Sequence, residues 1–145
     1  MKKIRPFLWF DDNAEEAAKF YTSIFKNSKI LNVNEQFVSF ELEGQEIMAL
    51  NGGPHFQLTP AFSFFVDCKT QAEVDDLWER LSKGGKKSQC GWLTDKFGLS
   101  WQIIPSALGE LMGDDDEKKS SAVMKAMLEM EKIDIKGLQE AYDNA

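Results

Sequence analysis

The stretch Cys90–Pro105, CGWLTDKFGLSWQIIP, decides the fold. Within it, Asp95–Gly98 reads as a tight turn with Gly98 at the position that needs a positive φ, and strand-forming residues flank the turn on both sides. The stretch therefore predicts a β-hairpin. In its second arm Gln102 faces away from Trp101, because strand side chains alternate. A polar side chain in the middle of a buried strand indicates that the Gln102 face is where a site should lie.

The N-terminal half of the chain follows the order strand, capped helix, strands. Apart from Arg5, residues 4–10 are apolar, and Asn13 with Glu16 has the layout of a capping box at the start of a helix. This helix is expected to end near residues 25–27. The strands expected after it cover residues 28–34, 37–42 and 45–50, and within residues 37–42 apolar and polar side chains alternate.

The second half repeats this order. A strand at residues 62–66 is followed by Thr70 and Glu73, a second capping box, and Gly84 is expected to end the helix. After this helix the sequence predicts only two strands, at residues 88–94 and 99–104. The halves therefore share an order of elements without a close repeat of residues.

The residues after Pro105 are helical in character. We expect a short helix at residues 107–112, a second after the acidic linker at 114–116, and a third capped by Asp134. The second of these helices carries an apolar stripe, Val123, Ala126, Met127 and Met130. Such a stripe must be covered, either by the open side of the sheet or by a second subunit.

The turn Asp95-Lys96-Phe97-Gly98 with the following Trp101-Gln102-Ile103 resembles the last hairpin of a vicinal oxygen chelate module, the βαβββ unit of glyoxalases, dioxygenases and fosfomycin-resistance proteins. More narrowly, the chain resembles the PhnB-like branch, whose members often carry the description demethylubiquinone methyltransferase-like. The resemblance implies an α+β fold in which two βαβββ modules form a curved, partly open sheet, followed by a helical C-terminal extension. It implies a single glyoxalase-like domain over residues 1–145, with module one at about 1–55, module two at about 56–106 and the extension at about 107–145.

Composition restricts the class of protein and its partners. The 145 residues are 43% hydrophobic and 28% charged, which is ordinary for one globular domain. A formal net charge of -7 argues against a nucleic-acid partner, which requires a basic face. No signal-peptide pattern or segment of transmembrane length is present, so we expect a cytoplasmic protein without a membrane partner. Cys68 and Cys90 are then expected to stay reduced.

The resemblance also implies where metal ligands would lie. These positions are Pro6, Leu50 or Asn51, Ala61 and Gln102. A divalent metal needs at least three converging ligands, and of these residues only Gln102 could serve, in a chain with a single histidine, His55. We therefore expect no metal and no cofactor.

Two residues are candidates for catalysis. Gln102 is one, and His55 is the other, either as a general base at a cavity rim or as an exposed loop residue. The ligand cavity is expected to be lined by Leu8, Phe10, Asn51, Ser63, Phe65, Cys90, Trp92 and Gln102. Cys90 reads either as a buried inert thiol or as a nucleophile activated by Lys86 or Lys87.

Two functions of different class remain open. The first is binding of an unknown small molecule in a metal-free cavity. The alternative is a metal-assisted lyase, isomerase or transferase acting on a small oxygenated substrate. Methyl transfer from S-adenosylmethionine in its common form needs a glycine-rich loop after the first strand, and residues 10–14 contain no glycine. The resemblance, together with the frequency of symmetric dimers, implies a homodimer.

Overall fold

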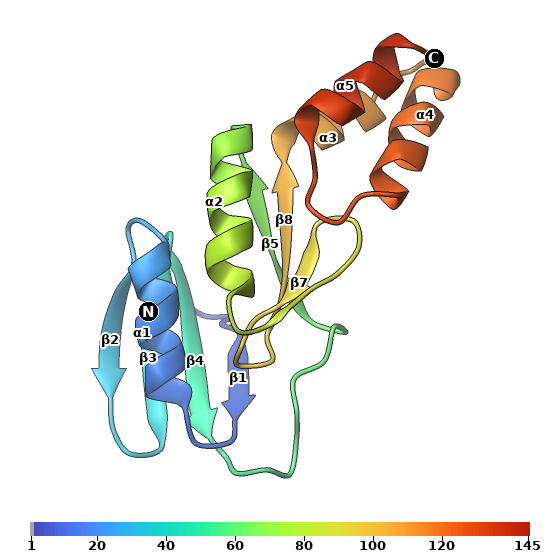
Figure 1. Cartoon of the computed structure of the whole chain (residues 1–145). Coiled ribbons are helices and arrows are strands. Elements are labelled where there is room, and N and C mark those ends of the chain that lie inside the picture. The colour runs from blue at the N-terminus through green and yellow to red at the C-terminus, as the bar shows by residue number, and fades with distance from the viewer. Residues whose placement is uncertain (1) are drawn as a thin grey trace. The chain divides into compact units, whose positions relative to one another are not determined.

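The computed structural model describes residues 2–145 and contains two compact units. The first unit ends at Thr59, and the second runs from Pro60 to Ala145 (Figure 1). Each unit has its own four-stranded mixed sheet. Across the described residues, no helix has both the length and the apolar composition needed to cross a membrane.

The first unit has the predicted order of strand, helix and three strands. Its elements are β1 (Phe7–Phe10), α1 (Ala14–Ile24), β2 (Lys29–Val33), β3 (Phe37–Leu42) and β4 (Gln45–Asn51). β1 pairs in parallel with β4, while β3 pairs antiparallel with both β4 and β2, which gives the sheet order β1-β4-β3-β2. β1 begins only after Pro6, whose nitrogen has no hydrogen to donate to a ladder.

Helix α1 covers one face of this sheet. Tyr21 of α1 lies over Phe40 of β3, with ring centroids 6.1 Å apart, and both side chains are fully buried. Leu8 and Phe10 belong to the same core, at 2% and 3% exposure. These two residues were predicted to line a ligand cavity; the alternation of β1 places them on the α1 side of the sheet and leaves Phe7, 50% exposed, on the opposite face.

The second unit repeats the topology of the first. Its elements are β5 (Ser63–Cys68), α2 (Gln71–Ser82), β6 (Lys86–Lys87), β7 (Trp92–Thr94) and β8 (Ser100–Pro105), in the sheet order β5-β8-β7-β6. β6 is the strand that the sequence pattern missed. Gly84, at φ +77°, follows α2 as predicted. The α+β class with two βαβββ modules is therefore confirmed.

The two helix starts differ in how they are capped. At α2 the predicted cap is confirmed, since Thr70 Oγ1 accepts a hydrogen bond from the Glu73 backbone N–H at 3.2 Å. At α1 the predicted cap is wrong, because the Asn13 side chain makes no capping bond within the described chain. Asn51 Oδ1, at the end of β4, accepts instead from the Ala14 N–H at 2.9 Å.

The hairpin around Asp95–Gly98 is confirmed. The Asp95 N–H donates to the Leu99 carbonyl at 2.8 Å and the Gly98 N–H donates to the Asp95 carbonyl at 3.0 Å. Gly98 has φ +92°, a conformation that costs glycine little because it has no Cβ. The turn sends β8 back along β7, so that Trp92 lies opposite Gln102.

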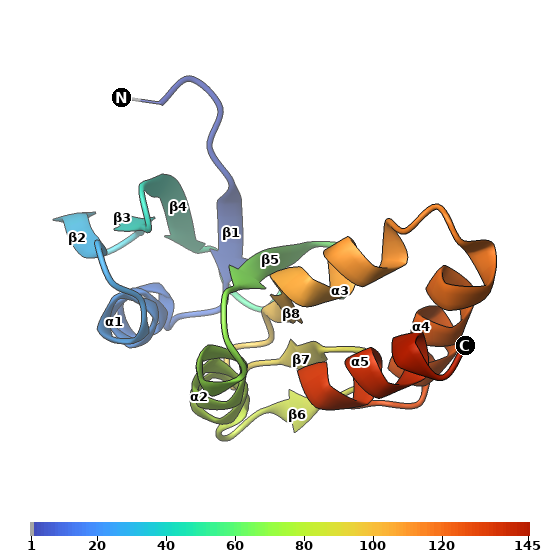
Figure 2. The same ribbon diagram turned by 90° about the horizontal axis from the view of Figure 1, so that it is seen from above.

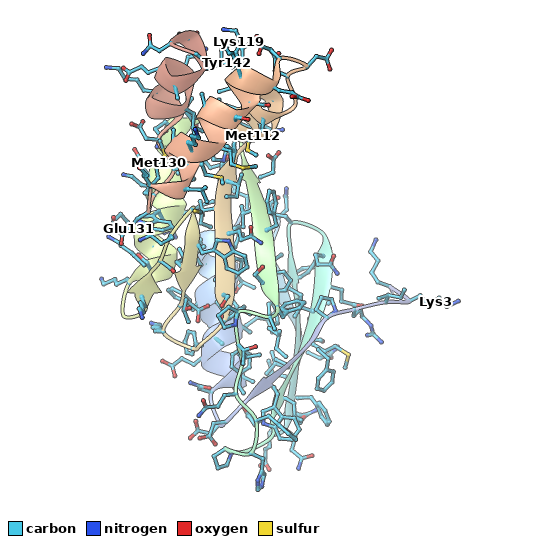
Figure 3. The ribbon with its side chains drawn as sticks, turned by 90° about the vertical axis from the view of Figure 1, so that its right-hand side faces the viewer. Lys3, Met112, Lys119, Met130, Glu131 and Tyr142 are labelled. Atoms are coloured by element: carbon cyan, nitrogen blue, oxygen red, sulfur yellow. The ribbon has the colours of Figure 1, made fainter. Side chains whose placement is uncertain are left out.

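The C-terminal extension forms three helices, α3 (Ser106–Met112), α4 (Glu117–Leu128) and α5 (Ile135–Asp143). They gather beyond the end of β8 (Figures 1 and 2) around a small core of Ile104, Leu108, Val123, Ile133 and Leu138. Met112, Met127 and Met130 pack against this core, and Figure 3 shows Met112 and Met130 in the extension. Ile104 shares the Gln102 face of β8 by alternation. The extension therefore covers the end of that face. Packing on the open side of the sheet was one of the two alternatives that the sequence left open, the other being a second subunit.

Candidate functional site

Four of the predicted site residues lie together on the second sheet. Phe65 on β5, Gln102 on β8 and Trp92 on β7 are paired across neighbouring strands, so their side chains share one face. Ser63, two residues before Phe65, lies on the same face. We refer to Ser63, Phe65, Trp92 and Gln102 as the candidate face.

The candidate face is the side of the sheet turned away from α2. Trp101 and Ile103, which alternate with Gln102 along β8, are 1% and 0% exposed, in the core that β8 forms with α2. The helix carries the matching apolar stripe Val74, Leu77, Trp78 and Leu81. Because α2 packs against the Trp101 side of β8, the Gln102 side chain lies on the side that α2 does not cover.

The Gln102 amide is the central polar group of the candidate face. Its Nε2 donates a hydrogen bond to Ser63 Oγ at 3.0 Å. A glutamine amide offers two N–H donors and one carbonyl acceptor, and across residues 2–145 no other hydrogen bond involves this side chain. The amide oxygen and one N–H therefore remain for a ligand, beside the Phe65 ring, which is 61% exposed.

The four residues of the candidate face carry no formal charge. Among the residues of β5, β7 and β8, the only carboxylate is Asp67, which by alternation lies on the same side of β5 as Ser63 and Phe65. Its Oδ1 accepts from the Ser106 hydroxyl at 2.8 Å and its Oδ2 pairs with Lys69 at 3.3 Å. The hydrogen bond from Ser106 is the main cause that lowers the pKa of Asp67 below its ordinary value. A face of amide, hydroxyl and aromatic groups suits an uncharged ligand.

Ser100 is a further polar residue that the predicted site did not include. It pairs with Ser63 and Thr94 across the sheet and lies on the Gln102 side of β8. Ser100 is 1% exposed, and its Oγ has no hydrogen-bond partner within residues 2–145. A buried hydroxyl without a partner is costly. Strand alternation in the sequence predicts this shared side of Ser100 and Gln102, although Ser100 was not counted among the site residues.

Two other predicted site residues, His55 and Asn51, belong to the first unit. His55 is exposed in a turn of the first unit, as one of its two readings predicted. Asn51 is engaged through both polar atoms, since Oδ1 caps Ala14 and Nδ2 donates to the Glu35 carbonyl at 3.1 Å. These bonds give Asn51 a capping role within its unit.

The two cysteines have different surroundings. Cys90 is half-buried, in the turn before β7. Lys87, one of the two lysines considered as its activators, pairs instead with Glu79 at 2.9 Å. Cys68 is fully buried at the end of β5, and burial raises the pKa of its thiol to about 12.

The residues present do not fit a divalent metal. No group of three or more His, Cys, Asp or Glu side chains that could hold a metal ion occurs within residues 2–145. Of the positions that the resemblance implies, Pro6, Leu50 and Ala61 have no side-chain donor, and the Asn51 amide is occupied by α1. Gln102 alone is too small a donor set.

Comparisons with known proteins agree with the fold. A family model described as 3-demethylubiquinone-9 3-methyltransferase matches residues 2–104. A PhnB protein from Bacillus cereus, named after the same methyltransferase, is 33% identical with a TM-score of 0.68, over 72% of this chain and 100% of its own. The fosfomycin resistance protein FosX from Listeria monocytogenes, solved with Mn(II) and sulfate, is 15% identical with a TM-score of 0.52, over 70% of this chain and 87% of its own. A search of curated proteins finds no match.

Proposed function

This chain belongs to the 3-demethylubiquinone-9 3-methyltransferase family, the PhnB-like branch of the vicinal oxygen chelate superfamily, and we propose that it binds a small, uncharged, oxygenated ring compound without a metal. The observation that carries the proposal is the alignment of Phe65, Gln102 and Trp92 across three neighbouring strands. Two aromatic side chains flank an amide that has hydrogen-bonding capacity to spare.

The chemistry of these groups selects the class of ligand. Aromatic side chains pack well against flat rings, and a glutamine amide can donate to a carbonyl or accept from a hydroxyl. The strands that carry the candidate face contribute no cationic side chain, so a phosphate or carboxylate would lack a charged partner there. A quinone headgroup, the class named in the family description, combines a flat ring with neutral oxygens and meets these requirements.

The methyltransferase part of the family description receives no support from the fold. S-adenosylmethionine enzymes of the common type use a doubly wound parallel sheet with a glycine-rich loop after the first strand. Here both sheets are mixed, and β1 runs into α1 through residues 11–13 without a glycine. We therefore propose binding rather than methyl transfer.

Isothermal titration with 2,3-dimethoxy-5-methyl-1,4-benzoquinone tests the proposal. We expect saturable binding to the wild type and, for Gln102→Ala, a dissociation constant about 2- to 10-fold larger, the loss of one neutral hydrogen bond. Gln45→Ala is the matched control, because Gln45 is an exposed glutamine in the first unit and should leave binding unchanged.

Thermal unfolding of the same variants separates the two roles of Gln102. Within residues 2–145 the side chain makes a single hydrogen bond, to Ser63, so its loss should cost little stability. A ligand-binding role therefore predicts a melting temperature close to that of the wild type for Gln102→Ala. No saturable quinone binding by the wild type, or unchanged binding by Gln102→Ala together with a clearly lowered melting temperature, contradicts the proposal.

We also propose a homodimer located in the cytoplasm. Support for the dimer comes from the aromatic side chains Phe7 and Phe37, which are 50% and 40% exposed on the face of the first sheet opposite α1 and pack edge to face. Exposed apolar groups that adjoin one another favour association. Light scattering that reports a single chain mass at micromolar concentration contradicts the dimer, and cell fractionation tests the location.

A further inference from the structure

The turn that leads into β7 has an unusual backbone. Cys90 and Gly91 both have positive φ, +59° and +83°, a conformation that is uncommon for residues other than glycine. In an extended strand successive N–H groups point to opposite sides, whereas successive residues in turn conformations can direct them to one side. The next residue in the chain is Trp92, which belongs to the candidate face.

Both N–H groups of this turn are bound by the C-terminal extension. The Cys90 N–H donates to the Met130 carbonyl at 2.8 Å, and the Gly91 N–H donates to the Glu131 carbonyl at 2.7 Å. Figure 3 shows Met130 and Glu131 at the end of the extension that lies nearest the sheet. The Gly91 carbonyl accepts in turn from the Ile103 N–H at 2.8 Å, so this one residue joins the extension to β8.

Packing around Gly91 leaves no room for a side chain. A Cβ added there would lie 2.8 Å from Ile104 Cδ1, 2.9 Å from the Ile103 carbonyl oxygen and 3.1 Å from Ile133 Cγ1. Ile133 is fully buried in the core of the extension together with Ile104. The extension therefore closes on the turn through side-chain packing as well as through two hydrogen bonds.

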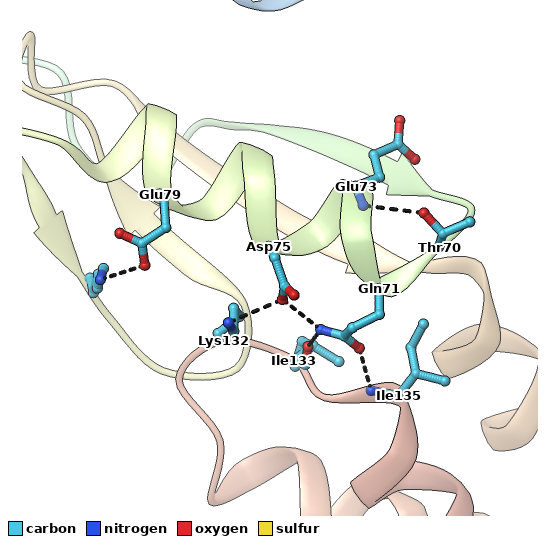
Figure 4. Close-up of polar contacts among 9 residues, drawn as sticks. Thr70, Gln71, Glu73, Asp75, Glu79, Lys132, Ile133 and Ile135 are labelled. Carbon is cyan, nitrogen blue, oxygen red and sulfur yellow. Dashed lines mark hydrogen bonds and ion pairs between the residues drawn. The ribbon is translucent and has the colours of Figure 1, made fainter.

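Gln71 of α2 makes two hydrogen bonds to the part of the extension that follows Met130 and Glu131 (Figure 4). Its Nε2 donates to the Ile133 carbonyl at 3.0 Å, and its Oε1 accepts from the Ile135 N–H at 2.8 Å. This second bond takes the place of the predicted Asp134 cap, because the Asp134 side chain makes no capping bond in the described part of the chain. Asp75 adds an ion pair with Lys132 at 3.0 Å.

We infer that the extension is a positioning element for the proposed ligand site: its segment Met130–Ile133, anchored by Gln71, fixes the turn Cys90–Gly91 and thereby the place of Trp92 on the candidate face. The match to the family model ends at residue 104, and the Bacillus cereus relative is fully covered by 72% of this chain. The segment Met130–Ile133 therefore lies beyond the part of the chain that the family model matches. The inference rests on the proposed function only in treating Trp92 as a ligand contact.

Fluorine NMR on the full chain labelled with 5-fluorotryptophan tests this positioning. The four tryptophans give separate reporters, and Trp92→Phe assigns the signal of Trp92. In Gln71→Ala we expect the Trp92 signal to shift or broaden and the signal of Trp9, in the first unit, to stay. Hydrogen exchange at the Cys90 and Gly91 amides should become about tenfold faster.

Two further variants complete the experiment. Asp76→Ala is the control on the same helix, because Asp76 pairs with Arg80, also in α2, at 3.5 Å, and it should leave the Trp92 signal unchanged. Ile133→Ala removes the side chain packed on Gly91 and should move the Trp92 signal further than Gln71→Ala does.

The outcomes distinguish this inference from the proposed function. A Trp92 signal like that of the wild type, in a variant whose Ile135 amide exchanges faster, overturns the positioning role. Unchanged exchange at Ile135 in both Gln71→Ala and Ile133→Ala overturns it as well, because the segment would then not depend on these contacts. Absence of quinone binding by the wild type refutes the proposed ligand class and leaves the fluorine result standing.

Discussion

The Asp95 carboxylate accepts a hydrogen bond from the Trp101 indole Nε1 at 2.9 Å, across the hairpin that joins β7 to β8. Its other oxygen accepts from the backbone N–H groups of Phe97 and Leu99 at 2.8 and 3.1 Å. Asp95 is 3% exposed, so its charge is stabilised by these donors rather than by water. One side chain thus fixes both the turn and the large aromatic residue next to Gln102.

Replacing Asp95 by asparagine should destabilise the second unit strongly. The amide oxygen can still accept from the turn, but its NH₂ group would face the indole N–H, leaving two donors opposed. We expect a loss of about 2–4 kcal/mol in the free energy of unfolding, measured by urea denaturation. In the Asp95→Asn, Trp101→Phe double variant the opposed donors are gone, so the combined loss should be smaller than the sum of the single losses. Additive losses would show that the two side chains are not coupled.

Asn51 should matter more to the start of α1 than Asn13, which precedes that helix. Asn51→Ala removes the acceptor for the Ala14 N–H and should cost about 0.5–2 kcal/mol, the range for a lost N-cap. Asn13→Ala is the matched control and should change the free energy of unfolding little, because its side chain makes no capping bond among the described residues. The reverse order of the two losses in chemical denaturation would contradict this assignment.

Tyr142 should titrate above an ordinary tyrosine. Its hydroxyl donates to Asp114 Oδ2 at 2.5 Å. This bond is the main cause that raises the pKa of Tyr142 and lowers the pKa of Asp114. Figure 3 shows Tyr142 beside Lys119 at the outer end of the extension. In Asp114→Asn we expect the pKa of Tyr142, followed by ultraviolet absorbance of the phenolate, to fall towards its ordinary value.

The same bond predicts how stability depends on pH. Because the pKa of Tyr142 is raised on folding, its contribution is present below the ordinary tyrosine pKa and is lost as pH rises through the folded value. The lowered pKa of Asp114 has the opposite effect on the pH dependence. The contribution of Asp114 to stability is present above the ordinary aspartate pKa and is lost as pH falls through the folded value. Asp115→Asn, the same charge change one residue away, should leave the tyrosine titration as it is. Equal effects of the two variants would mean that net charge, and not the hydrogen bond, sets the shift.

The thiol of Cys68 should be protected in the native protein. With a pKa of about 12, its thiolate fraction at about pH 8 is on the order of one in ten thousand. We expect 5,5′-dithiobis(2-nitrobenzoate) to modify the half-buried Cys90 first and Cys68 only after denaturation. Cys90→Ala should therefore show almost no reaction until denaturant is added. Rapid reaction of the native Cys90→Ala variant would contradict the burial of Cys68.

Local signals in the sequence predicted local structure. The Asp95–Gly98 turn and the Thr70 cap were confirmed because their bonds join residues within four positions of one another. The caps of α1 and α5 were predicted wrongly because their acceptors are distant in sequence: Asn51 lies 37 residues from Ala14, and Gln71 lies 64 residues from Ile135. A capping residue next to a helix is readable from sequence, whereas one supplied by another element depends on the tertiary fold.

The candidate site was predictable only in part. Alternation along β8 placed Gln102 opposite Trp101, and the shared face of Ser63, Phe65 and Trp92 followed once the strands were paired. For β1, alternation gave two sets of residues but no means of deciding which set α1 would cover. Leu8 and Phe10, predicted at the cavity, are buried in the core on the α1 side. β6 was missed because two residues, Lys86 and Lys87, are too short to show any period.

The strand order of each unit has a consequence for the way the chain folds during synthesis. β1 is bonded in its sheet to β4, the last strand of the first unit, and β5 likewise depends on β8. Each sheet therefore remains without its first strand until its last strand has left the ribosome. The sheet of the first unit is complete at Asn51, so it can form while the second unit is still being translated, as domains that fold in N-to-C order do. A stalled nascent chain that ends within β4 should hold β1 unpaired and exposed to protease.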